Sequence, residues 1–153
     1  MMNEGLRPGG LTALAVVNFL VAALTVFVIL SSTVTIMILT HPEMTGEHQA
    51  RLRGILEEHD IGVSYFVISI AVSAVLMTLL IVSGVGYLMQ KKILGRILGS
   101  SFAVLSLARN VVEIVTLPED GGGGVDPLRI LVMTYALLTL VLLNTTFRRD
   151  FVN

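Results

Sequence analysis

Long runs without charged residues, separated by short polar segments, dominate the hydrophobic pattern of this chain. Leu11–Leu39 runs for 29 residues without a charge, and Ile61–Gln90 runs for 30. Ile93–Leu117 is mostly apolar, and Ile130–Phe147 adds 18 uncharged residues. A helix of about 20 mainly apolar residues crosses the hydrocarbon core of a bilayer. The pattern therefore predicts an all-α, four-helix transmembrane bundle with spans at about 11–39, 63–89, 93–117 and 128–144.

The polar segment Thr40–Asp60 has a helical pattern of its own. Leu52, Ile55 and Leu56 are spaced i, i+3, i+4 and alternate with charged residues. Pro42 suits a first helical position. We expect a short amphipathic helix that lies on the membrane face or caps the bundle.

The other connections leave no room for a second domain. Gln90-Lys91-Lys92 is a tight basic turn, so the second and third spans must form an antiparallel hairpin. Pro118–Pro127 contains Gly121–Gly124 and is expected to be a flexible connection. We therefore expect a single integral membrane domain over residues 1–153.

Basic residues are distributed unequally between the predicted loops. With both termini inside, the inner side carries six basic residues and the outer side three. The inner residues are Arg7, Lys91, Lys92, Arg96, Arg148 and Arg149, and the outer residues are Arg51, Arg53 and Arg129. An excess of Lys and Arg marks cytoplasmic loops. We expect a multi-pass protein of the bacterial inner membrane with cytoplasmic termini.

Composition removes several classes of function. The net charge of −1 gives no basic field for nucleic acid, and the absence of Cys excludes thiol catalysis and thiolate-held metals. His41, His48 and His59 lie in or beside the outer loop, where a solvated helix face is favoured over a metal site. We expect no catalytic residue, no cofactor and no metal.

The third span carries the residues that stand out most. Gly95, Gly99 and Ala103 form a small-residue seam that lets another helix approach closely. Packing within the bundle is the favoured interpretation, and a dimer or partner interface is the alternative.

Arg109, Asn110 and Glu113 continue that stripe, and charges within a span are a functional hypothesis by default. Arg109 and Glu113 can pair at i, i+4. Hydroxyl residues estimated at similar depth complete a candidate intramembrane polar cluster. They are Ser31, Ser32, Ser69 and Tyr135. The cluster is interpreted first as structural and second as a proton path, solute path or partner-binding charge. Asn18 and Asn144, toward the inner side, are expected to bond neighbouring helices.

The opening segment Arg7–Asn18 reads R-P-G-G-L-T-A-L-A-V-V-N. It resembles the start of a set of uncharacterised small bacterial four-span membrane proteins that opens R-P-x-G-[LV]-T-x-L-A-x-x-N. The acidic outer loop, the basic turn with Gly95-Arg96 and the charged tail are similar too. The resemblance implies this topology and supplies no catalytic residue.

Two functions remain open at this point. The first is a non-enzymatic accessory or scaffolding subunit that sits in the bilayer and binds a membrane protein or another copy of itself. The second is a small transporter or channel-like protein that uses the Arg109/Glu113 pair.

Overall fold

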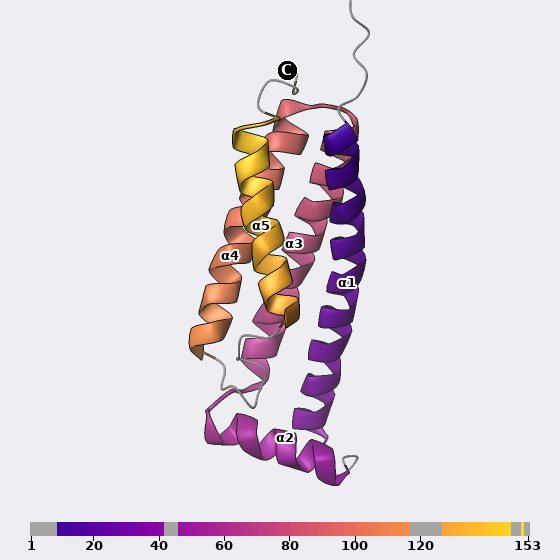
Figure 1. The fold of residues 1–153 in the computed structure, drawn as a ribbon. Helices are drawn as coiled ribbons and strands as arrows, with labels where there is room; N and C mark the ends of the chain where they lie inside the picture. The colour runs from indigo at the N-terminus through magenta and orange to yellow at the C-terminus, as the bar shows by residue number, and fades with distance from the viewer. Residues whose placement is uncertain (1–8, 42–45, 117–126, 148–150, 152–153) are drawn as a thin grey trace, which may run out of the picture.

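The described part of the chain forms five α-helices, and four of them run lengthwise beside one another (Figure 1). The computed structural model describes residues 9–41, 46–116, 127–147 and 151. The helices are α1 (Gly9–Thr40), α2 (Glu47–Glu58), α3 (Val63–Leu88), α4 (Leu98–Thr116) and α5 (Pro127–Asn144). A π-helical turn, η2 (Lys92–Ile97), leads directly into α4.

Three of these segments are long and apolar enough to cross a membrane: α1, α3 and the continuous stretch Lys92–Thr116. The chain is therefore a multi-pass membrane protein. The apolar part of α5, Arg129–Asn144, is shorter. At 1.5 Å per residue, the 18 residues of α5 extend about 27 Å, slightly less than a hydrocarbon core of about 30 Å. When η2 and α4 are taken together, the bounds of the four long helical segments lie within two residues of the predicted ones.

The amphipathic helix predicted in the first loop is confirmed as α2. The helix begins where the backbone N–H of Gly46 donates to the side-chain oxygen of Gln49 at 2.9 Å. Leu56 is buried, and the helix lies across the end of the bundle beside α1 and α3 (Figure 1). Pro42 lies outside the described residues.

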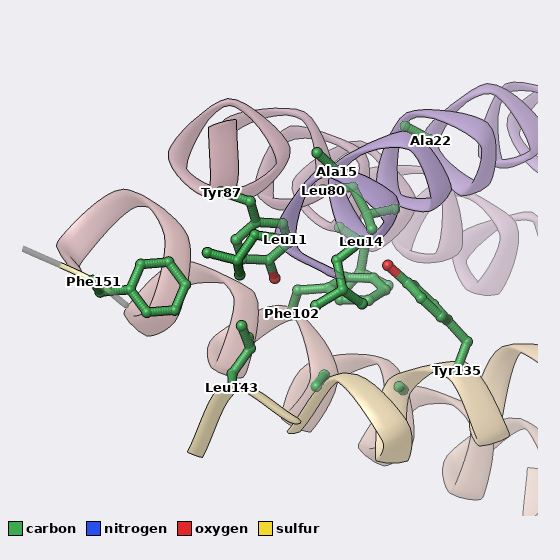
Figure 2. Close-up of a cluster of buried hydrophobic side chains, with 13 residues drawn as sticks. Leu11, Leu14, Ala15, Ala22, Leu80, Tyr87, Phe102, Tyr135, Leu143 and Phe151 are labelled. Carbon is green, nitrogen blue, oxygen red and sulfur yellow. The ribbon is translucent and has the colours of Figure 1, made fainter. Parts of the chain in front are cut away.

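The hydrophobic core extends from the middle of the bundle toward the α3–η2 turn and Phe151 (Figure 2). Tyr87 and Phe102 are its largest fully buried side chains. Outside the core, long apolar side chains remain exposed, as on Phe27 and Val115. Such surfaces suit contact with lipid.

Close backbone contact defines the hairpin between α3 and η2. A Cβ atom on Gly86 would lie 2.2 Å from the backbone nitrogen of Gly95. Gln90 turns the chain there with a φ of 54°. The basic turn predicted at this point thus brings two glycine backbones together, which a side chain on Gly86 would prevent.

Candidate functional site

The charges of the third span meet in what we call the outer charged cluster, formed by Arg109, Glu113, Arg129, Ser69 and Ser73. Arg109 Nε donates to Glu113 Oε1 at 2.6 Å, so the predicted i, i+4 pair is present. The other guanidinium nitrogens of Arg109 donate to Ser73 Oγ at 2.6 Å and to Ser69 Oγ at 3.1 Å. One arginine on α4 is thereby tied to two successive turns of α3.

Glu113 also connects α4 to α5. Its Oε2 atom lies 3.4 Å from Arg129 Nη2 in the first turn of α5. The cluster is therefore a chain of positive, negative and positive groups. The exposed fractions of these side chains are 15% for Arg109, 16% for Glu113 and 9% for Arg129. A charge removed from water to this extent is tolerated when opposite charges and hydrogen bonds compensate it.

A groove runs between α3 and α4 beside the outer charged cluster. Its volume is about 490 Å³, and Arg109 and Glu113 contribute to its lining. The remaining lining is mainly apolar, with Tyr65, Ile68 and Val112 among the larger side chains. The groove is shaped to hold an apolar group next to an ion pair.

A second polar group, the inner polar network, joins three helices nearer the other end. It consists of Asn18, Ser83, Tyr135 and the backbone carbonyl of Leu80. The Asn18 Nδ2 atom donates to Ser83 Oγ at 2.8 Å and to Leu80 O at 3.2 Å. The hydroxyl of Tyr135 donates to Asn18 Oδ1. One fully buried amide therefore fastens α1 to both α3 and α5, as expected for an intramembrane asparagine.

The described hydrogen bonds of Tyr135 and Asn110 do not reach the ion pair with which the sequence grouped these residues. Tyr135 packs beside Phe102, with ring centroids 6.4 Å apart, and its hydroxyl belongs to the inner polar network. Asn110 is buried and donates to the backbone carbonyl of Ser106 on its own helix at 2.8 Å. Of the hydroxyl residues expected near the pair, Ser69 is bonded to Arg109.

The small-residue seam is filled from within the same chain. A Cβ atom on Gly99 would lie 2.0 Å from Tyr87 Oη and 2.8 Å from Leu143 Cδ1. Gly95 lies against Phe151 and the backbone of Gly86, and Ala103 is completely buried. These contacts agree with the favoured interpretation, packing within the bundle. A dimer or partner interface on this seam stays the alternative prediction.

The sequence pattern does not predict that Arg129 and Ser73 belong to the outer charged cluster. Arg129 is counted only as a charge of the outer side at the start of the fourth predicted span, and the sequence does not predict that it reaches Glu113. Ser73 follows Ser69 by one helical turn and therefore presents a second hydroxyl on the same side of α3. That i, i+4 serine pair was the available signal for an arginine partner.

The histidine loop gives no metal centre in the part of the chain that the structure describes. No group of three or more His, Asp or Glu side chains there is arranged to hold an ion. The ring of His59 bonds the backbone carbonyl of Ile55 at 2.9 Å. The side chain of His48 lies outside the described residues.

Comparisons with known proteins do not identify the chain. No protein-family model, no curated protein and no solved structure matches it. The resemblance of Arg7–Asn18 to small four-span bacterial proteins thus stays a prediction. What the chain does must be argued from the two polar groups and the surfaces around them.

Proposed function

We propose that α5 is a fourth span and that the protein sits in a bacterial inner membrane with both termini in the cytoplasm. The start of α1, the α3–η2 turn and Phe151 lie at one end of the bundle, and α2 lies at the other (Figure 1). This arrangement agrees with the six basic residues counted for the inner side.

We propose that the chain is a non-enzymatic accessory or scaffolding subunit of a membrane protein complex. The observation that carries this proposal is that the charged groups of the outer charged cluster bind one another. Arg109 and Glu113 bind each other, and their remaining described contacts reach Ser69, Ser73 and Arg129. Groups committed to such contacts hold helices together, whereas a carrier must release its charged groups to bind and exchange a solute.

A scaffold of this kind would meet its partner through the lipid-facing surfaces. The seam is filled internally, and the outer part of α1 carries large exposed side chains such as Phe27 and Leu30. Self-association through the same surfaces is a form of this proposal. A membrane complex buries such surfaces through close van der Waals packing rather than through a hydrophobic driving force.

A small transporter or channel-like protein is the second candidate, and the groove between α3 and α4 is the observation that favours it. The groove of about 490 Å³ reaches both Arg109 and Glu113. In this case the pair would open when a proton or solute arrives. Glu113→Gln would then keep the fold and abolish a proton- or solute-dependent flux in proteoliposomes.

Site-specific photo-crosslinking in native membranes tests the scaffold proposal. A photoreactive residue at Phe27 or Leu30, both exposed on α1, should crosslink to one and the same protein. The buried Leu14 serves as the matched control on that helix and should give no crosslink. The substitution Phe27→Glu on this helix surface should also lower the abundance of the crosslinked partner or its assembly into the complex. If the partner is a second copy of this chain, the substitution should lower self-assembly. Crosslinks to lipid alone at both exposed positions would contradict the proposal.

A further inference from the structure

A hollow lined by basic, hydroxyl and apolar side chains lies farther along η2 and α4 than the groove described above, on the side of the α3–η2 turn, and Leu105 contributes to both. Its volume is about 680 Å³. We call it the basic hollow. It is lined by Lys92, Arg96, Ile97, Ser100, Ser101, Val104, Leu105 and Asn144. Neither the proposed function nor either polar group uses it.

Positive charge collects at one end of the basic hollow without a described carboxylate beside it. Lys92 and Arg96 are one helical turn apart in η2, and Lys92 is exposed. Among the described residues, the acidic side chains in ion pairs are Glu57 and Glu113, neither of them with Lys92 or Arg96. An anion at this end would thus meet two cations that no described acid neutralises.

Hydrogen bonds hold the polar side chains on one wall of the basic hollow in place. Arg96 Nη2 donates to Asn144 Oδ1 at 3.3 Å, and Asn144 Nδ2 donates to Ser100 Oγ at 3.2 Å. A guanidinium has five N–H donors, so Arg96 retains donors for a phosphate. Ser100 accepts from Asn144, which leaves its own O–H free to donate. The wall therefore offers charged and neutral donors side by side.

The remaining lining fits an acyl chain. Ile97, Val104 and Leu105 are exposed apolar residues that continue along the helix away from the charges. From Lys92 to Leu105 the helix rises about 20 Å at 1.5 Å per residue. One leaflet of a bilayer, headgroup included, is about 20–22 Å thick. Cations at the surface followed by apolar residues over this depth match one phospholipid.

We propose that the basic hollow binds an anionic phospholipid, with the phosphate at Lys92 and Arg96 and one acyl chain along Ile97, Val104 and Leu105. The site requires that the α3–η2 turn lies at a membrane surface, and it does not depend on whether the chain is a scaffold or a transporter. The cytoplasmic leaflet carries the anionic lipids that attract basic residues.

Native mass spectrometry with two competing lipids tests this proposal. The full chain is equilibrated with equal amounts of phosphatidylglycerol and phosphatidylcholine that carry the same acyl chains. One phosphatidylglycerol should be retained in preference. A basic side chain at an anionic surface contributes about a fivefold change in binding. Lys92→Gln should therefore lower the preference about fivefold, and K92Q/R96Q about 25-fold.

Lys91→Gln is the matched control, because Lys91 is adjacent and does not line the hollow. Lys91→Gln should change the preference for phosphatidylglycerol less than twofold. An equal loss of preference in Lys91→Gln and Lys92→Gln would show that the basic residues attract anionic lipid without a defined site, and would overturn the proposal. If the double variant loses its fold by circular dichroism, Lys92→Gln alone decides, since Arg96 and Asn144 stay bonded. No preference in the parent protein overturns the proposal. Displacement of the lipid by inorganic phosphate alone would assign the hollow to a free anion instead.

Discussion

Replacing Glu113 by leucine should destabilise the bundle more than any other single change in the outer charged cluster. Glu113 accepts from Arg109 at 2.6 Å and lies 3.4 Å from Arg129, so its loss removes the carboxylate that binds Arg109 and one partner of Arg129. Breaking a buried pair by removing one partner typically costs about 3–5 kcal/mol. We expect Glu113→Leu near the upper end of this range and Arg109→Leu near the lower end, because Glu113 then still has Arg129.

The free energy of unfolding can be measured by titrating the protein in mixed micelles with a denaturing detergent and following far-UV circular dichroism. A double-mutant cycle separates pairing from independent effects. R109L/E113L should lose less stability than Glu113→Leu alone, since the double change leaves no unpaired charge on α4.

The chain contains its own control for this experiment. Arg53 and Glu57 have the same i, i+4 spacing and the same 2.6 Å separation, but their side chains are 30% and 59% exposed. Exposed helix pairs contribute about 0.3–0.5 kcal/mol. Glu57→Leu should therefore have almost no effect. Similar losses for Glu57→Leu and Glu113→Leu, or additive losses in the R109L/E113L double variant, would refute the compensation of buried charge.

Three further predictions concern packing, hydrogen bonding and orientation. Gly99→Ala should cost about 1–3 kcal/mol by overpacking, because its Cβ would lie 2.0 Å from a hydroxyl oxygen on α3. A Cβ atom on Gly54 of α2 would meet nothing within 4 Å, so Gly54→Ala should stabilise the protein. Equal thermal unfolding temperatures of the two variants would contradict close packing at Gly99. Tyr135→Phe removes the hydrogen bond to α1 and should cost about 1 kcal/mol in the same detergent titration; an unchanged value would show that the bond contributes nothing. Because the chain has no cysteine, Lys91→Cys and Arg51→Cys can be labelled singly in cells. An impermeant thiol reagent should reach Arg51→Cys alone, and the reverse result would invert the topology.

Helix positions could be predicted from the sequence because membrane insertion depends on the length of an apolar run. The bounds of α3, Val63–Leu88, therefore follow from hydrophobicity along the chain. The Arg109–Glu113 pair was predictable for a similar reason, since i, i+4 neighbours on one helix meet whatever the rest of the bundle does.

Contacts between helices required information that the sequence does not contain. Counting residues from the helix ends gives the depth of a side chain in the membrane only if all spans begin and end at the same two membrane surfaces. The structure has a helix of 32 residues, α1, beside one of 18 residues, α5. Counting residues from the ends of such unequal helices predicts that Tyr135 lies at the same membrane depth as Arg109. In the structure, the hydroxyl of Tyr135 instead donates to Asn18. The same assumption assigns Arg129 to the outer membrane surface and does not predict it as the second partner of Glu113.

The most direct test of the central claim is whether water reaches Arg109 and Glu113 in the membrane. Ser73 is completely buried, and its hydroxyl accepts from Arg109 at 2.6 Å. Because the chain has no other cysteine, labelling of Ser73→Cys reports on the access of water to the Arg109 side chain alone. In sealed vesicles, a water-soluble maleimide should leave Ser73→Cys unlabelled from both sides while it labels the exposed Arg51→Cys fully from one. Labelling of Ser73→Cys at a rate similar to that of Arg51→Cys would show a water path to the charges and would contradict the scaffold account.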